Sequence, residues 1–413
     1  MGSNPGSGVS RRSFIKYSGA AGLAGALAGC GLQDSSSSDG GSSGELVIGS
    51  NHPLSGSLSN TGERMNQAVE LAAMIKNENG GIESLDGAEV SVVSGDNEGS
   101  QELGGEVAQE LIDEGADVLT GCYSSPVTSA ATRTAERERV PFVISVSVND
   151  GILQETQLNY AYRPQPSARK MGVDSANLLP EVVRNGGQEI ETAGLFYIDI
   201  SFGQSVRDTL QEELPKNGIE VVASESIGFG ETADTQVTSF RNADPDAIIA
   251  TTYRAGTIEL VSAMDNQNYS PPIIAGCSNA AMNDVSALEE MGQTVEGGFA
   301  TNFALDPTLD RAAEVRSRFE EEFDSGFDAN VAMTYAATEV IIEAAEQAGS
   351  TDSEEINNTL SEITVEDHIA AMPPITFRDD GENANALAPL FQVQDLDDKV
   401  IAPDEFAETE PQF

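Results

Sequence analysis

From residue 46 onward, short apolar runs alternate with longer segments in which apolar residues recur every three or four positions. The runs at residues 46–50 and 90–94 predict buried strands, because a short apolar run between polar turns is typical of a strand covered on both faces. Residues 62–79, between them, predict a helix, since their apolar positions fall on one helical face. The same alternation predicts further strands at residues 117–121, 140–146, 193–198, 219–223, 247–252 and 272–276, and further helices at residues 102–114, 127–138, 171–184, 203–214 and 257–267.

The order of these elements predicts an α/β fold of two doubly wound parallel-sheet lobes. Strands that alternate with helices form parallel sheets covered by helices on both faces. The alternation runs twice and breaks at Arg163-Pro164-Gln165-Pro166, and a length of 413 residues at roughly 150 per domain agrees with two or three domains. Beyond a strand at residues 295–301, the pattern predicts long helices at residues 311–323 and 331–348 and edge strands at residues 375–377 and 389–393.

The N-terminal segment carries the features of an export signal. Arg11 and Arg12 are followed by Phe14 and Lys16, and residues 19–29 form a short, mildly apolar run. Twin arginines ahead of such a run resemble a twin-arginine export signal. The run is too short for a membrane-spanning helix, which needs about 20 apolar residues. We therefore expect residues 1–29 to be a signal peptide.

A lipid attachment site is predicted directly after this signal. Leu27-Ala28-Gly29-Cys30 resembles a lipobox, in which small residues precede a cysteine whose sulfur takes a lipid. Residues 33–44, rich in Ser, Gly and Asp, are typical of a flexible tether, so residues 30–44 are expected to be the lipidated cysteine and its linker. The protein is thus expected to be held at the extracellular face of the cell membrane through Cys30.

The charge balance excludes some partners and indicates a solvent. The chain has 68 acidic and 21 basic residues, for a net charge of −47, while 39% of its residues are hydrophobic. Binding to nucleic acid or to an anionic membrane surface needs clustered Lys and Arg, so we expect no nucleic-acid partner. Self-repulsion of this size opposes folding unless salt screens it, which indicates a hypersaline, halophilic setting.

No catalytic, metal or cofactor motif stands out, so we expect no enzyme activity and no cofactor. His52 and His368 are the only histidines, and there is no HExxH, P-loop, CxxC or GxSxG pattern. A secreted hydrolase remains an alternative, which incubation with esters and amides would test. Cys122 and Cys277 follow different predicted strands, and we expect free thiols rather than a disulfide.

Polar and aromatic clusters follow several predicted strands. They include Tyr123-Ser124-Ser125, residues 145–149 and Tyr253-Arg254. Open α/β sheets bind ligands where strands end and helices begin, and a helix N-terminus suits a carboxylate. Ser125 fits that role, and the alternative is that Ser124 or Ser125 simply caps the helix.

At this point the chain resembles the type I periplasmic binding proteins of ABC importers, specifically the branched-chain amino-acid group. The resemblance runs from about residue 45 to residue 377, and more loosely to the end. It is carried, in order, by Pro53-Leu54-Ser55-Gly56, Asn79-Gly80-Gly81-Ile82, Gly121-Cys122-Tyr123-Ser124-Ser125, Phe202-Gly203 and Tyr335-Ala336-Ala337, behind a lipoprotein signal.

The resemblance implies two lobes joined by three crossovers that close on ligand by a hinge. The crossovers are expected near residues 163–165, 301–303 and 377–381. The first lobe would then hold residues 45–163 and 303–377, and the second lobe residues 164–302 and 378–413.

The resemblance also assigns roles to single residues. A serine in the position of Ser125 binds the ligand carboxylate in the family, and a threonine in a loop that matches residues 145–149 helps it, so Asn149 is a candidate for that second role. Ser147 is expected to offer its carbonyl to the ligand ammonium, while Phe202 and Tyr253 wall the side-chain pocket. Tyr123 and Ser124 belong to the same predicted ligand-binding cluster.

Two departures from the family pattern affect the choice of ligand. Thr61 occupies a first-loop position that is often aromatic, and Cys277-Ser278-Asn279 stands where a carboxylate pairs with the ligand ammonium. A buried ammonium without such a partner costs several kcal/mol. An amide, a urea-like molecule or another organic acid is therefore an alternative ligand, and Arg254 is either an anion-binding residue or a surface charge.

We therefore expect a lipid-anchored solute-binding protein that captures a branched-chain amino acid or a similar small polar metabolite. Its partners would be an ABC permease with its ATPase subunits and, through the anchor on Cys30, the membrane. The alternative is a sensor, because the same fold serves as a receptor domain, and a sensor should carry a fused or partner signalling segment.

Overall fold

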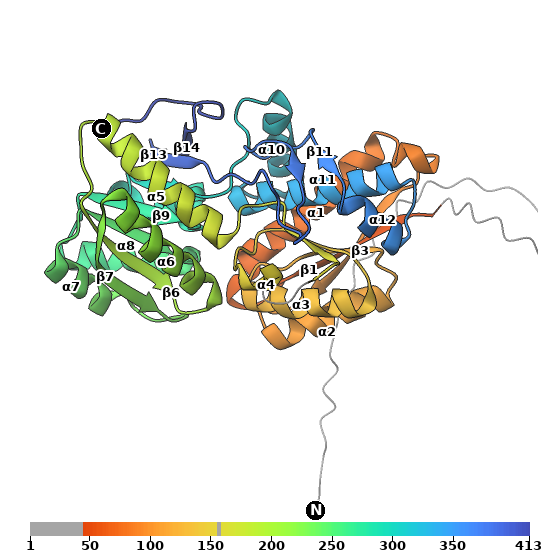
Figure 1. Ribbon diagram of the computed structural model, residues 1–413, viewed down its shortest axis with the longest axis horizontal. Coiled ribbons are helices and arrows are strands. Elements are labelled where there is room, and N and C mark those ends of the chain that lie inside the picture. Colours follow the sequence, from red (N-terminus) through yellow and green to blue (C-terminus); the bar gives the residue numbers. More distant parts are fainter. Residues whose placement is uncertain (1–43, 155–157) are drawn as a thin grey trace, which may run out of the picture. The chain divides into compact units, whose positions relative to one another are not determined.

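The computed structural model describes residues 44–154 and 158–413, in which two sheets each carry helices on their faces (Figure 1). The first sheet has the strand order β2-β1-β3-β4-β5, and all of its neighbouring strands run parallel. Its strands are β1 (Leu46–His52), β2 (Val90–Asp96), β3 (Val118–Gly121), β4 (Phe142–Ile144) and β5 (Ala161–Tyr162). The predicted signal, the lipidation site Cys30 and nearly all of the tether lie outside the described residues.

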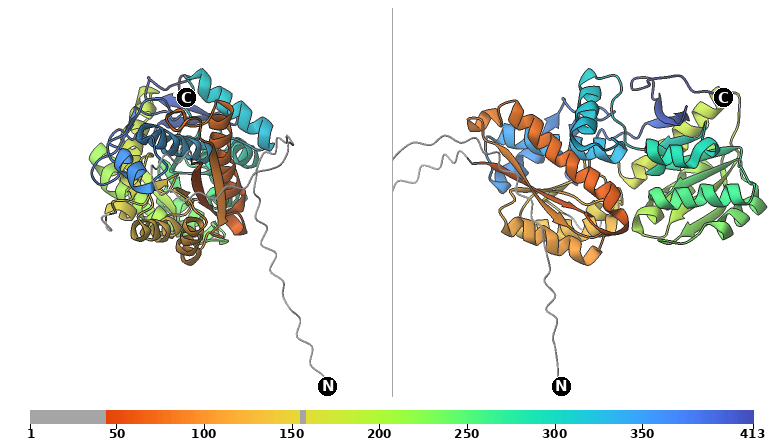
Figure 2. Two further views of the ribbon diagram at one scale, coloured as in Figure 1. Left: turned by 90° about the vertical axis from the view of Figure 1, so that its right-hand side faces the viewer. Right: turned by 180° about the vertical axis from the view of Figure 1, so that it is seen from behind.

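Helices cover both faces of this first sheet. On one face α1 (Ser59–Glu78) packs against α11 (Ala329–Ala348), and on the other α2 (Gln101–Asp113) packs against α3 (Ser125–Glu138). The view from behind shows α1 crossing its face of the sheet (Figure 2). The remaining helices on this side are α4 (Gly151–Gln154), α10 (Asp310–Phe323) and α12 (Ser353–Leu360). This sheet and these helices are called the first lobe below.

The second sheet has the strand order β14-β13-β10-β9-β8-β6-β7. The strands from β10 to β7 are mutually parallel, whereas β13 and β14 are antiparallel to their neighbours. Its strands are β6 (Thr192–Ile198), β7 (Glu220–Ile227), β8 (Ala247–Thr251), β9 (Ile273–Cys277), β10 (Phe299–Thr301), β13 (Leu390–Gln394) and β14 (Asp397–Ala402), and its helices are α5 (Ala168–Asn185), α6 (Ser201–Glu213), α7 (Asp234–Ala243), α8 (Arg254–Asn266) and α9 (Val285–Met291). This sheet and these helices are called the second lobe below.

The C-terminal strands differ from the prediction. β13 was expected at an edge, but it lies inside the second sheet because β14, which the sequence pattern did not reveal, pairs with its free side. Residues 375–377 were also expected to form an edge strand. Instead, β12 (Ile375–Thr376) pairs with β11 (Thr364–Val365) in a separate two-stranded sheet. The last two strands of the second sheet are thus added to its parallel strands by antiparallel pairing.

Segments that link the lobes lie side by side around Arg163. Its backbone N–H donates to the carbonyl of Gly381 (2.8 Å), and its carbonyl accepts from the N–H of Asn383 (3.1 Å). Its guanidinium pairs with Glu382, with Nη1 3.0 Å from Oε1, and the side chain is fully buried. A buried charge needs such a partner. Two of the linking segments are therefore tied to each other.

Cys122 and Cys277, one at the end of a strand in each lobe, are both buried and free of any disulfide. Burial raises the pKa of both thiols, that of Cys277 to about 12. Among the described helices, none is both long enough and apolar enough to cross a membrane.

Candidate functional site

A small cavity lies where the strands of both lobes end. Its volume is about 30 Å³, about that of one water molecule in the liquid. Ligand sites of open α/β sheets lie at this end of the strands, so this cavity is the candidate site. The lining residues are Tyr123, Ser125, Val146, Ser147 and Val148 of the first lobe, Phe202, Thr252, Tyr253, Ser278 and Ala280 of the second, and Asn302, Phe303 and Asn330.

Aromatic rings from both lobes meet at this cavity. The ring centroids of Tyr123 and Tyr253 are 4.9 Å apart, and that of Phe202 is 5.3 Å from Tyr253. Phe229, which is 55% exposed, also stacks on Tyr253, with 5.8 Å between the ring centroids. Tyr253 therefore contacts an aromatic ring of the first lobe and two rings of its own lobe.

Ser125 is the first residue of α3 and lines the cavity. Ser124 occupies the N-cap position, but its side chain makes no capping hydrogen bond, and Pro126 supplies no N–H to the first turn. The Ser125 hydroxyl accepts from the backbone N–H of Asn149 at 3.4 Å, a long hydrogen bond. The capping alternative is therefore not seen at Ser124, and Ser125 stands just inside the helix.

Two residues of the loop after β4 are already engaged. The Ser147 carbonyl accepts from Nε2 of Gln165 (3.1 Å), and its hydroxyl lies 2.5 Å from Oγ1 of Thr128. The side chain of Asn149 does not line the cavity. Its Nδ2 donates to the carbonyl of Ser201 in the second lobe at 2.8 Å, so Asn149 links the two lobes.

Three other predicted residues lie beside the cavity rather than in its lining. Thr61 lies next to the hydroxyl of Tyr123, whose pKa is raised by burial. Ser124 precedes α3 without lining the cavity. The Arg254 guanidinium pairs with Glu290, with Nη2 2.9 Å from Oε2. Arg254 is thus already matched by an acidic neighbour.

Two buried polar atoms at the cavity lack a hydrogen-bond partner among the described residues. They are the hydroxyl of Tyr253, a residue that is 8% exposed, and Oδ1 of Asn302, a residue that is 2% exposed. Ser124 lies close to the Tyr253 hydroxyl, without the geometry of a hydrogen bond. Burial raises the pKa of Tyr253 to about 12, so its hydroxyl stays a neutral donor. An unsatisfied buried polar group is costly, and both residues line the space that a ligand would fill.

Asn302 was not predicted from the sequence. It directly follows β10, so the rule that selected the residues after β3 and β8 also applies to it. Its Nδ2 donates to Oδ1 of Asn283 (3.0 Å) and to the carbonyl of Asn279 (3.2 Å). These two bonds fix the orientation of the amide and leave Oδ1 free to accept.

An ion cluster also missed by sequence reasoning spans the lobes. Nη2 of Arg64, on α1, lies 2.9 Å from Oδ2 of Asp284 in the second lobe and 2.9 Å from Oδ2 of Asp328 at the start of α11. Burial acts to raise the pKa of Asp284, but the pairing with Arg64 and the hydrogen bonds outweigh it, so this pKa is lowered. For Asp328 burial prevails and the pKa is raised.

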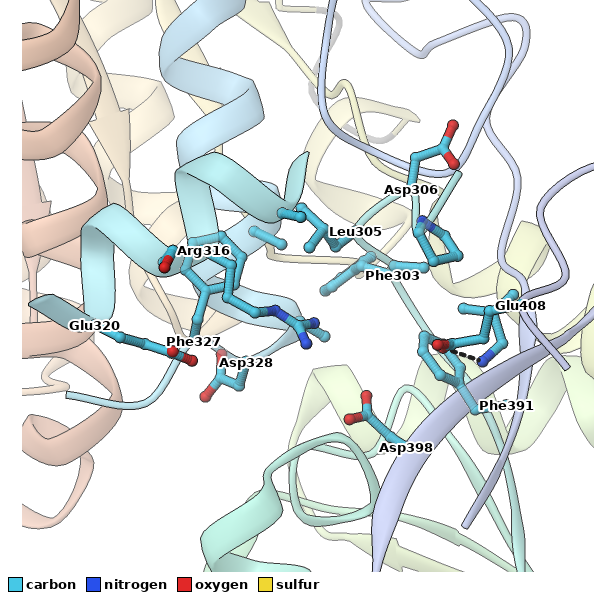
Figure 3. A pocket seen from close by; sticks show the side chains of 17 residues that line it. Phe303, Leu305, Asp306, Arg316, Glu320, Phe327, Asp328, Phe391, Asp398 and Glu408 are labelled. Atoms are coloured by element: carbon cyan, nitrogen blue, oxygen red, sulfur yellow. Dashed lines mark hydrogen bonds between the residues drawn. The ribbon is translucent and has the colours of Figure 1, made fainter. Parts of the chain in front are cut away.

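A second, larger cavity of about 330 Å³ lies near this cluster. Figure 3 shows the guanidinium of Arg316 pointing into it, with the carboxylates of Asp328 and Asp398 close by. Burial raises the pKa of Asp398 to about 7. None of the predicted ligand-binding residues lines this cavity.

Comparison with known proteins identifies the family. The family model described as periplasmic binding protein matches residues 45–399, and a model of the twin-arginine translocation signal matches residues 8–28. The Leu/Ile/Val-binding protein homolog 7 of Brucella abortus (strain 2308) is 25% identical over 377 residues, which cover 87% of this chain and 91% of that protein.

Solved structures agree in fold. The substrate binding protein LivJ of Streptococcus pneumoniae, in complex with isoleucine, superposes with a TM-score of 0.72 at 19% identity, covering 85% of this chain and 96% of that one. The leucine binding protein LivK of Thermotoga maritima gives a TM-score of 0.73 at 20% identity, covering 87% and 99%. These matches confirm the resemblance seen in the sequence, including the α/β fold and the export signal. Because the family model spans most of the chain, the chain belongs to the periplasmic binding proteins, a family of substrate-binding proteins rather than enzymes.

Proposed function

We propose that this chain is the lipid-anchored solute-binding component of an ABC importer, which holds a small carboxylate metabolite between its lobes and delivers it to a permease. The observation that carries the proposal is the cavity lined by both lobes, at which the ring of Tyr123 contacts the ring of Tyr253 with 4.9 Å between the centroids. The relatives support a solute of the size of a branched-chain amino acid, since isoleucine is bound by the S. pneumoniae protein.

Capture begins at the first lobe in this proposal. The start of α3 offers the hydroxyl of Ser125 and the free N–H groups of an uncapped first turn, which suit a carboxylate. The second lobe then closes with Phe202 and Tyr253, which cover the body of the solute. Closure excludes water, so the polar contacts inside gain strength. The permease would recognise this closed form.

Entry of a solute requires the lobes to part. A cavity of about 30 Å³ holds about one water, far less than a molecule with the side chain of leucine. Contacts such as that between Asn149 and Ser201 must therefore break on opening and reform around the solute. The described state is then a closed one.

Localisation follows from the N-terminal sequence. The twin-arginine signal indicates export, and we propose that Cys30 then takes a lipid that holds the protein at the extracellular face of the membrane. The serine-rich tether that follows would let the lobes reach the permease.

The experiment is to recover small molecules bound to the pure protein. The protein is incubated with an extract of its own cells in concentrated KCl, washed, and denatured, and released molecules are identified by mass spectrometry. Ala280→Trp fills the cavity and should abolish retention, whereas Glu259→Trp, at an exposed position of α8, should not. Equal retention by the two variants, or none by the unaltered protein, would contradict the proposal.

A further inference from the structure

The lining of the small cavity is uncharged throughout. Its polar members are Ser, Thr, Tyr and Asn side chains, and no Asp, Glu, Lys or Arg lines it among the described residues. This is unusual in a chain with 68 acidic residues. A solute with both a carboxylate and an ammonium would find no side chain there with a charge opposite to that of its ammonium.

Three helices begin at the cavity, and all three have a bare start, meaning that no side chain caps the helix and no acidic residue lies in its first turn. Ser125 opens α3, Phe202 lies in the first turn of α6, and Tyr253 precedes α8, and all three residues line the cavity. None of these helices, of 14, 13 and 13 residues, has a capping side chain or an acidic residue in its first turn. Bare helix starts from both lobes therefore direct partial positive charge at one small space.

Other helices of the chain begin differently. Asp284 caps α9, Asp328 caps α11 and Asp352 caps α12, while α7 and α10 start with Asp234 and Asp310. Among the described helices of eight residues or more, only one other, α1, has neither a capping side chain nor an acidic residue in its first turn. The start of α1 does not line the cavity. The acidic residues that elsewhere stabilise helix starts are thus missing where the solute would bind.

The carboxylates near the cavity already have ion-pair or hydrogen-bond partners. Asp284 and Asp328 both pair with Arg64, and Asp328 also accepts the N–H groups of Asn330 and Val331. Asp199, which precedes α6, is exposed and accepts from Gln204 (2.9 Å). An ammonium placed in the cavity would lose its water without gaining a free carboxylate, which is unfavourable.

The two unpartnered buried atoms supply the second, independent indication of what binds. The hydroxyl of Tyr253 is a free donor, and Oδ1 of Asn302 is a free acceptor. A hydroxyl group on the solute is complementary to both, since it can accept from the O–H of Tyr253 and donate to Oδ1 of Asn302. An ammonium only donates, so it would leave the Tyr253 hydroxyl without an acceptor.

We propose that the solute is a small hydroxycarboxylate, an anion in which a neutral hydroxyl takes the place of the ammonium of an amino acid. This inference rests on the function proposed above and narrows its solute class. The carboxylate lies at the bare helix starts, and the hydroxyl lies between Tyr253 and Asn302.

The test offers the protein matched pairs that differ only in this group. Equilibrium dialysis in concentrated KCl uses lactate with alanine, 2-hydroxy-3-methylbutanoate with valine, 2-hydroxy-4-methylpentanoate with leucine, and 3-phenyllactate with phenylalanine. In the pair that binds, the hydroxy acid should bind about tenfold or more tightly than its amino partner. Tyr253→Phe, which keeps the ring but removes the hydroxyl, should weaken the binding of the hydroxy acid by about tenfold.

A charge added to the cavity should reverse the preference. Ser278 has a φ of 52°, a left-handed conformation that Asp and Asn tolerate well. Ser278→Asp should shift binding toward the amino partner, whereas the uncharged control Ser278→Asn should not. The same shift in both variants, or in neither, would contradict the charge argument.

The outcomes separate this inference from the proposed function. An amino acid that binds more tightly than its hydroxy partner, or a retained cellular molecule that reacts with an amine reagent such as dansyl chloride, overturns the hydroxycarboxylate and leaves a solute-binding protein. A protein that enriches no member of any pair and retains no molecule from the extract overturns both.

Discussion

Arg64 and Asp284 form an ion pair between the two lobes, with Nη2 of the arginine 2.9 Å from Oδ2 of the aspartate. Both side chains are almost fully buried, and Arg64 also holds Asp328 of its own lobe. Opening of the lobes would separate Arg64 from Asp284, so this pair stabilises the closed state specifically. Breaking a charged pair that is buried in one state leaves uncompensated charge there.

Asp284→Asn should therefore shift the protein toward its open form. Asparagine still caps α9, so the helix start is kept while the charge is lost. We expect solute affinity to fall by about tenfold, because a hydrogen bond to a charged group contributes roughly 1.5–3 kcal/mol. Small-angle X-ray scattering should show a larger radius of gyration without solute. Asp352→Asn, the same change at the cap of α12, is the control, and equal effects of both would contradict the assignment.

Ser125→Ala tests the carboxylate site. Loss of the hydroxyl should weaken binding of 2-hydroxy-4-methylpentanoate or leucine, whichever binds more tightly, by about ten- to a hundredfold. The melting temperature without solute should barely change, since the structure gives Ser125 no capping role. Ser129→Ala, further along the same helix, is the matched control. A loss of stability with affinity preserved would remove Ser125 from the site.

His52 should make the protein sensitive to acid. Complete burial lowers the pKa of this imidazole from 6.5 to about 3. At a pH between these two values, His52 is protonated in the unfolded chain but neutral in the folded chain. The free energy of unfolding is therefore highest above pH 6.5 and falls as the pH drops toward 3. Between pH 6.5 and pH 4.5 the loss amounts to about 2–3 kcal/mol.

His52→Gln removes this titration, so its free energy of unfolding should fall less over the same pH interval. Chemical denaturation at the two pH values measures the difference. His368→Gln is the control, because burial also lowers the pKa of His368 while hydrogen bonds to backbone carbonyls oppose that shift. A pH dependence in His52→Gln as steep as in the unaltered protein would contradict the prediction.

Cys30→Ser should release the protein from cells into the medium, because the serine cannot take the lipid. Fractionation of cells into membrane and soluble material, followed by immunoblotting, measures this. The lipobox interpretation is wrong if the variant stays with the membranes as the unaltered protein does.

Folding should depend on salt. The net charge of −47 must be screened, and the Debye length shrinks from about 10 Å at 0.1 M salt to about 3 Å at 1 M. The few lysines and arginines are largely paired already, as Lys216 is with Glu212 and Glu213. We expect the melting temperature to rise steeply between about 0.1 M and about 3 M KCl. A flat profile would speak against a halophilic surface.

The sequence predicted the strands of both sheets except β5 and β14, and most of their helices, because these elements bury regular apolar faces. α7 was missed because only Val237 and Phe240 of its residues are buried, and α12 because it is short and mostly polar. β14 was missed because three of its six residues are half-exposed and charged. Pairing of that strand also moved β13 from the expected edge into the sheet.

At the site, the rule that ligands bind at strand ends selected Tyr123, Ser125 and Tyr253, which the structure places around one cavity. The cluster of Arg64, Asp284 and Asp328 was not predicted because its members are distant in sequence. In so acidic a chain, each carboxylate also resembles an ordinary surface charge. Asn302 escaped because a single asparagine after a short strand gives no pattern. Their roles depend on three-dimensional proximity, which no local spacing encodes.

The two buried thiols make this protein suited to optical measurement. Cys122 and Cys277 are fully buried, and burial raises the pKa of both, so neither offers a thiolate to an alkylating dye at neutral pH. With Cys30 replaced by serine, one surface cysteine introduced in each lobe would be labelled selectively by maleimide fluorophores. Energy transfer between the two dyes would then report closure directly, without removal of the native cysteines.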